Sequence, residues 1–307
     1  MTISGSIGLS RGDDLLQALQ GAAEAAWRSG GDTLPRAALV LVAGAGNAEL
    51  LAAAARKALP RVPLAGGLVA GILSDGGITT SGAAVCCFYG DLNPSVALGG
   101  RAPGLCAATE RAGRLMLAGA PDRRHYPRGV ALAFARPVAT SFTEEFLVRW
   151  RHLAGPKLRT VFSATSGDPL SGPGSESPGE LAVLSIEGAY QSGIGVAAGF
   201  VPGETVPDAA TLVHGSADAA TTAVKRLEGR TVRIALVAES AVRHAALGPA
   251  AREEWMAMRD QIGLDVPCLG WLTRAECGYG RGVTASGETG SVVVAALGDP
   301  APAPDRP

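Results

Sequence analysis

The residue types best suited to chemistry gather near the C-terminal end of the chain, in the stretch VPCLGWLTRAECGYGRG. A short apolar run there leads into a polar, glycine-containing loop, whose candidate ligand-binding residues are Trp271, Thr273, Arg274, Glu276 and Cys277. Ligands of open α/β sheets bind beyond the carboxyl ends of strands, where the Glu276 carboxylate can hold a ligand ammonium group. The alternative is a structural carboxylate that accepts backbone N–H bonds within the turn. Trp271 either walls the pocket or packs in the core.

Two earlier stretches, 62–88 and 159–186, are laid out in the same way. The first carries candidate site glycines that either let a ligand approach the backbone or serve only as turn residues, namely Gly66, Gly67 and Gly71. The second carries Asp168, which either faces the same pocket or caps a turn. The chain has no GxxxxGK motif, so a nucleotide-phosphate loop is not supported.

Nucleophilic and metal chemistry have less support. Cys277 can act as a nucleophile beside Glu276, but Cys/His chemistry needs a nearby histidine, and none is near in the sequence. A structural cysteine is the other interpretation. The four histidines are scattered, so we expect no metal site. A single histidine can ligate haem, and His214, at the predicted end of a strand over 210–215, is the first choice. No other cofactor is expected.

The elements that position these residues recur three times. Residues 37–88, 129–186 and 232–297 each follow the order strand, helix, strand, loop, strand. Strand–helix–strand units place two strands parallel, and the returning strand adds antiparallel pairs. We therefore predict an α/β fold with mixed sheets built from three strand–helix–strand–loop–strand units. The predicted segments are 1–120, a middle unit 121–208, a third segment 209–298 and a disordered tail 299–307.

Composition excludes several classes of partner. The 307 residues carry 27 basic and 28 acidic side chains, a net charge of −1, so neither a nucleic-acid face nor a polybasic membrane segment is indicated. No apolar run reaches the ~20 residues that span a bilayer, and no secretion signal is visible. Five cysteines without a CxxC pair predict reduced thiols and a cytoplasmic location. Abundant Ala, Arg and Gly suggest a bacterial source.

The three stretches also resemble a known family. The segment ALVLVAGAGNAELLAAAARKALPRVPLAGGLVAGILSDGG resembles the N-terminal half of FIST domains, with Gly66 and Gly71 in the family's glycine positions. PCLGWLTRAEC resembles the FIST C-terminal segment, in which Gly270, Trp271 and Glu276 match its Gly, aromatic and Glu. FSATSGD resembles the middle motif through its Gly-Asp pair. The chain departs from the family where Gly67, Arg274 and Ala275 replace its usual Cys or Ser, aromatic and Gly, respectively.

The resemblance implies FIST N-like and C-like segments over 1–120 and 209–298, and a bacterial sensory protein that binds a small ligand. Because no output domain is visible, signal transduction would pass through a separate signalling partner. Some members bear haem and sense nitric oxide, so a haem-bearing gas sensor is one alternative. An enzyme on the same scaffold, using a loop pocket around Glu276 and Cys277, is another. A purely structural partner protein is the third.

Overall fold

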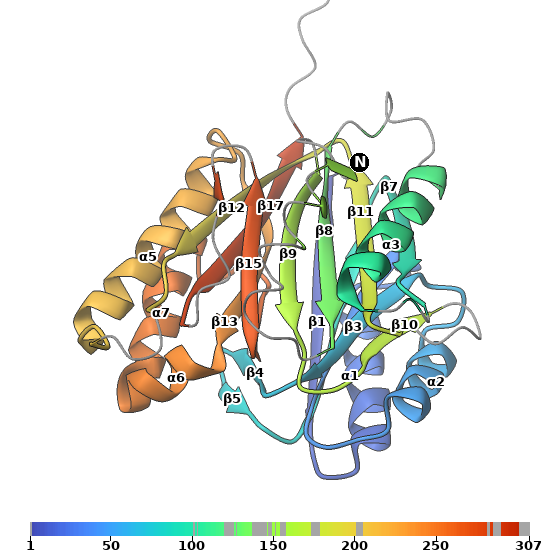
Figure 1. Cartoon of the computed structure of the whole chain (residues 1–307), viewed down its shortest axis with the longest axis horizontal. Helices are drawn as coiled ribbons and strands as arrows, with labels where there is room; N and C mark the ends of the chain where they lie inside the picture. The colour runs from blue at the N-terminus through green and yellow to red at the C-terminus, as the bar shows by residue number, and fades with distance from the viewer. Residues whose placement is uncertain are drawn as a thin grey trace, which may run out of the picture.

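Three consecutive units of similar order make up the fold (Figure 1). The computed structural model describes residues 2–100, 102, 104–119, 126, 128–136, 146, 149–150, 152–153, 158–172, 179–200, 205–280, 283–284 and 290–300. The first unit comprises β1 Ser4–Arg11, α1 Leu15–Ser29, β2 Ala37–Ala43, α2 Ala48–Ala58, β3 Leu64–Val69, β4 Gly71–Ser74, β5 Gly77–Thr79 and β6 Gly82–Tyr89.

The second unit repeats this order. It comprises β7 Leu92–Leu98, α3 Leu105–Gly119, β8 Arg128–Ala135, helical residues at 146, 149–150 and 152–153, β9 Leu158–Ala164, β10 Pro169–Gly172 and β11 Leu181–Gly188. The third comprises β12 Tyr190–Ala197, α5 Ala209–Lys225, β13 Val232–Ser240, α6 Ala241–Leu247, a 3₁₀ turn Gly248–Ala250, α7 Ala251–Ile262, β14 Cys268–Thr273, β15 Ala275–Gly280, β16 Val283–Thr284 and β17 Val292–Pro300. The predicted α/β class and its three units are confirmed, and each unit also begins with a further strand and helix.

Each unit forms its own mixed sheet and lends a strand to another. The strand orders are β1-β6-β2-β3-β10, β16-β15-β9-β8-β11-β7 and β12-β17-β13-β14-β4-β5. The first unit therefore gives β4 and β5 to the third sheet, the second gives β10 to the first, and the third gives β15 and β16 to the second. In this cyclic exchange β3, β9 and β14 each pair with a strand from another unit, and the exchanged strands β10, β16 and β5 form the outer edges.

The three points at which one unit's chain passes to another unit's sheet, here called the strand crossings, are alike in detail. The backbone N–H of Ala70 donates to Leu272 O at 3.1 Å, that of Ser166 to Leu68 O at 2.7 Å, and that of Arg274 to Ala164 O at 3.0 Å. Each bond joins the residue after one strand to the end of another unit's strand. The ends of β3, β9 and β14 are thereby linked.

The core lies where the inner faces of the three sheets meet. Alternate residues of the strands from all three units bury their side chains in one apolar cluster, for example Leu41, Leu132, Phe134, Leu236 and Ala295. The opposite faces carry helices: α1 and α2 cover the first sheet, α3 the second, and α5 and α7 the third (Figure 1). Because the central strands are covered on both faces, they read as continuous apolar runs.

Capping residues set the starts of α1 and α2. The Asp14 carboxylate accepts from the backbone N–H groups of Leu16 and Gln17 at 3.1 Å, and the Asn47 side chain caps α2 in the same way. Such bonds satisfy N–H groups that have no partner within the helix.

All five cysteines are free thiols.

Three local expectations need correction. Residues 64–69 and 275–280, expected as glycine-rich loops, are strands β3 and β15. Gly66 allows close approach rather than a turn, because a Cβ there would lie 1.6 Å from the carbonyl oxygen of Val40 on β2. Residues 210–215, expected as a strand, belong to α5. Its buried residues recur at helical spacing, and Asp208 caps its start by accepting from the Thr211 N–H.

The tail expectation falls partly beyond the described chain. Asp299 and Pro300 are the last residues of β17, and the remainder of 299–307 lies outside the described residues. Within the described part of the chain, no helix is both long enough and apolar enough to cross a bilayer. The division into segments 1–120, 121–208 and 209–298 stays a prediction, as does the cytoplasmic location.

Candidate functional site

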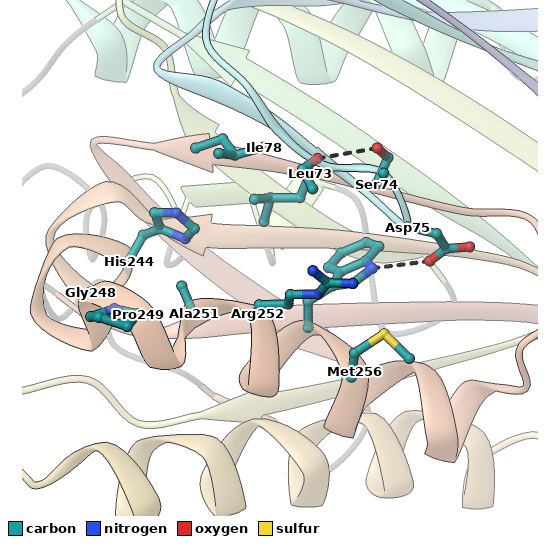
Figure 2. A pocket seen from close by; sticks show the side chains of 13 residues that line it. Leu73, Ser74, Asp75, Ile78, His244, Gly248, Pro249, Ala251, Arg252 and Met256 are labelled. Atoms are coloured by element: carbon teal, nitrogen blue, oxygen red, sulfur yellow. Dashed lines mark hydrogen bonds between the residues drawn. The ribbon is translucent and has the colours of Figure 1, made fainter.

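A cavity of about 400 Å³ lies where a hairpin of the first unit meets helices of the third. The β4–β5 hairpin forms one wall, and α6, the 3₁₀ turn and α7 form the other (Figure 2). The lining residues are Leu73, Ser74, Asp75, Gly76, Gly77, Ile78, His244, Gly248, Pro249, Ala251, Arg252, Trp255 and Met256. Its volume is that of a small-molecule site, and mixed apolar walls with few polar groups are typical of such sites.

The hairpin wall owes its shape to the sequence Ser74-Asp-Gly-Gly. Ser74 and Gly77 pair across a turn of two residues, and Gly77 has a φ of +89°, which glycine adopts readily. Arg11 ties the hairpin to β1 by donating to Gly76 O at 2.9 Å and to Thr79 Oγ1 at 3.1 Å. The hairpin is therefore held on its outer side.

Asp75, at the hairpin tip, fixes the hairpin to α7. Its Oδ1 accepts from Trp255 Nε1 at 3.0 Å and from Arg259 Nε at 2.9 Å, and its Oδ2 accepts from Arg259 Nη2 at 3.3 Å. Arg259 is almost fully buried, whereas the Asp75 side chain is 62% exposed. The pair joins two units across the cavity and neutralises the Asp75 charge.

His244 and Glu239 form the group in this cavity best suited to proton transfer. His244 lies on α6 at the opposite end of the cavity from Asp75 (Figure 2), and its Nδ1 is 3.1 Å from Glu239 Oε1. The Glu239 side chain, at the end of β13, is only 2% exposed, and that of His244 is 20% exposed. The hydrogen bond orients the ring so that Nε2 is the nitrogen left for a ligand.

Both side chains of this pair have shifted pKa values. Burial raises the pKa of Glu239 to about 7, against the opposing hydrogen bond from His244. The same hydrogen bond raises the pKa of His244 above its ordinary value, while partial burial lowers it. A histidine held by a carboxylate is the usual arrangement of a general acid or base.

A second polar cluster is made of buried residues that do not line this cavity. The buried Arg243 guanidinium bonds Glu254 at 2.7 Å and also donates to Ser216 Oγ and to the Gly290 carbonyl. Glu276 accepts from the Ser291 N–H at 3.1 Å and from its hydroxyl, and burial raises the pKa of Glu276 to about 8. We call these residues, Ser216, Arg243, Glu254, Glu276, Gly290 and Ser291, the closed network.

The predicted site residues fall mainly at the strand crossings. Gly67 lies on β3 facing Thr165, whose methyl would be 2.3 Å from an added Cβ. Trp271 is fully buried and donates from Nε1 to Ser163 Oγ at 2.9 Å, and Thr273 Oγ1 donates to Ala164 O at 3.0 Å. Glu276 is paired in register with Ser163, which brings it to the same region. The structure thus gathers Gly67, Trp271, Thr273 and Glu276 around the end of β9.

The other predicted residues are dispersed. Gly66 packs on β2, and Gly71 lies on β4, two residues before the lining residue Leu73. Asp168 pairs with Arg136 on the surface at 2.7 Å, and Arg274 is exposed. Cys277 is fully buried, and burial raises the pKa of its thiol well above the ordinary value, so the thiol stays protonated at neutral pH. Of the predicted site residues, none lines the cavity at the hairpin.

The described residues offer no grouping of three His, Cys, Asp or Glu side chains that could hold a metal ion. His214 is on the exposed face of α5, 3.4 Å from the Asp218 carboxylate, and haem binding there stays a prediction.

The loop that the sequence predicts as the site does not contain the residues that line the cavity. A usable signal was the sequence AESAVRH, in which a glutamate ends a strand and a histidine follows five residues later in the first turns of a helix. The rule that ligands bind beyond the carboxyl ends of strands applies to β13 as well as to β14. The lining by β4 and β5 had no comparable signal, because it depends on strand exchange.

Comparisons with known proteins give only distant similarities. No family model matches the chain, and no curated protein matches it. Two solved structures of cyanuric acid hydrolase align with nearly the whole chain, each at 11% identity. One, described as evolutionary innovation by structural concatenation, gives a TM-score of 0.43 over 96% of this chain and 98% of that one. The other, from A. caulinodans, gives 0.46 over 98% and 99%.

These comparisons correct the resemblance to FIST domains. The chain matches no family model, FIST models included, and the two solved structures named above are cyanuric acid hydrolases rather than FIST sensors. The expected sensory role and the expected part in signal transduction are therefore withdrawn. The short glycine and Gly-Asp motifs do not identify FIST domains. This fold uses them at strand crossings, where close approach of two backbones requires small residues.

Proposed function

We propose that this protein is an enzyme that performs acid–base chemistry on a small molecule bound in the cavity between the β4–β5 hairpin and α6–α7. His244 transfers the proton, and Glu239 orients its ring. The observation that carries the proposal is that a histidine lining a ligand-sized cavity is hydrogen-bonded to an almost fully buried carboxylate.

The chemistry follows from the arrangement. With Nδ1 held by Glu239, Nε2 takes a proton from the substrate, or from a water that attacks it, and later returns that proton to the product. The imidazolium formed in between is stabilised by Glu239 at 3.1 Å. Ser74 is the hydroxyl-bearing residue of the lining, and its Oγ donates to Gly77 O at 3.2 Å within the hairpin. We therefore assign no covalent nucleophile, and the earlier alternative of Glu276 and Cys277 in a loop pocket gains no support from their full burial.

The test is a screen for turnover with matched histidine variants. Purified protein is incubated with a panel of small metabolites, and consumption is followed by NMR. His244→Gln removes the proton-transferring nitrogen, and His214→Gln, on the exposed face of α5, is the control. We expect a turnover that falls by about 10²- to 10⁴-fold in His244→Gln, the usual contribution of a general acid or base, and is unchanged in the control.

Two results would overturn the proposal. Equal turnover in His244→Gln and the wild type would remove His244 from the chemistry. Compounds that bind the cavity, none of which is converted, would make the protein a small-molecule binder without catalysis.

A further inference from the structure

The side chains around the cavity carry more positive than negative charge. Arg252, on the first turn of α7, lines the cavity between His244 and Asp75 (Figure 2). In the described part of the chain, its guanidinium has no hydrogen bond or ion pair. The acidic lining residue, Asp75, is already neutralised by the two bonds from Arg259. Arg11 adds a second positive charge at the back of the hairpin, where it bonds Gly76 O.

The remaining titratable groups do not reverse this balance. Glu239 and His244 share a hydrogen bond, and the pair carries no net charge whenever one titrating proton is shared between the two side chains. The cavity therefore presents positive potential to a ligand, and its low-dielectric walls strengthen that field.

The walls themselves are apolar. Leu73, Pro249 and Trp255 contribute apolar lining, and Ile78 and Met256 are large hydrophobic residues that stay 40% and 37% exposed at its edge. Covering such side chains with an apolar ligand is favourable, in proportion to the area removed from water. The Trp255 ring is held in place by its bond to Asp75 at 3.0 Å, so it is a rigid surface for a flat group.

Together these features define a ligand class, and this inference rests on the proposed function. We infer that the cavity takes a small monocarboxylate with an apolar, preferably planar, body. The carboxylate pairs with the Arg252 guanidinium, whose planar fork matches two carboxylate oxygens, and the body lies along the apolar wall with its reactive end toward His244. A single free guanidinium suits a monoanion better than a phosphate dianion.

Binding can be tested without knowing the natural substrate. Titration calorimetry is run with phenylacetate, with phenylacetamide as the uncharged equivalent, and with phenyl phosphate as the dianion. The variants are Arg252→Gln and, as a control of equal charge change, Arg28→Gln on the exposed side of α1. We expect phenylacetate to bind about 10- to 100-fold more tightly than phenylacetamide, the scale of a charged hydrogen bond. That preference should disappear in Arg252→Gln and persist in Arg28→Gln.

The outcomes separate this inference from the proposed function. Equal binding of phenylacetate and phenylacetamide, tighter binding of phenyl phosphate, or a preference that survives Arg252→Gln would each overturn the ligand class. Catalysis by His244 on uncharged substrates would leave the proposed function standing without the carboxylate. Carboxylates that bind through Arg252 in both the wild type and His244→Gln, but are never converted, would uphold the inference and overturn the enzyme.

Discussion

Glu239 and Glu276 are two buried carboxylates of the third unit, and their surroundings differ in one respect. Glu239 bonds a histidine that opens on a cavity, so a proton can pass between it and a ligand. Glu276 bonds Ser291 within the closed network and is fully buried. Burial raises the pKa of both, and Glu239 is the one whose hydrogen-bonded partner lines the cavity at the hairpin. A shifted pKa therefore marks a candidate site only when access accompanies it.

The largest expected effect is in the closed network. Arg243→Met leaves Glu254 buried without its partner, which should lower the free energy of unfolding by about 3–5 kcal/mol. Urea denaturation measures this loss. The double variant Arg243→Met, Glu254→Gln removes both charges and should recover most of the stability. A loss below about 1 kcal/mol in the single variant would contradict the assignment of this network as structural.

The second prediction concerns pH. Glu276 has a folded pKa of about 8, above its unfolded value near 4.5, so its protonated form favours folding. Its stabilising contribution is fully present below about pH 4.5 and is lost as the pH rises towards 8. Glu276→Gln should remove this part of the pH dependence, on the order of a few kcal/mol at 1.4 kcal/mol per pKa unit.

Denaturation of Glu276→Gln and wild type at several values between pH 5 and 8.5 gives the comparison, with the exposed Glu24→Gln as the control. Parallel stability curves for Glu276→Gln and wild type would show that Glu276 is ionised at neutral pH, and the contrast with Glu239 would then disappear.

A smaller effect is expected at the cavity. Glu239→Gln removes the hydrogen-bonded charge that raises the pKa of His244, so that pKa should fall. NMR titration of the His244 ring protons reports it directly. An unchanged pKa of His244 would mean that the two side chains are not coupled.

The smallest effect is expected for Arg252→Gln. Because Arg252 is exposed and bonds no described residue, unfolding free energy should change by less than about 0.5 kcal/mol, while carboxylate binding weakens. A large loss of stability would place Arg252 with the structural residues rather than with the ligand site.

Much of the fold could be predicted from the sequence because its signals are local. Continuous apolar runs such as residues 37–43 are typical of buried strands, and Asp14 and Asn47 are residue types that favour helix starts. The recurrence of element order revealed the three units. The glycines of residues 275–280 resemble turn residues and so predict a loop, whereas Gly278 lies in a strand where an added Cβ would meet Val196 and Val293 at 2.9 Å.

The candidate site was less predictable. The spacing of Glu239 and His244 is readable, but the opposite wall is the β4–β5 hairpin, in which β4 pairs with β14 almost 200 residues later in the chain. Strand pairing over such a distance depends on tertiary packing and leaves no local pattern. The bond from Trp255 to Asp75 likewise joins two units and has no local pattern.

The cyclic exchange of strands also bears on how the protein is made. During synthesis the first unit emerges with β4 and β5 lacking their partner, because β14 belongs to the third unit. The second sheet likewise waits for β15, although the rest of its unit is complete. Until the third unit has emerged, each ribosome-bound intermediate therefore contains at least one strand without its final neighbour. The cyclic exchange of strands is complete only when that unit has been made. The hairpin wall meets α6 and α7 only then, so the cavity between them forms only once the third unit has been made.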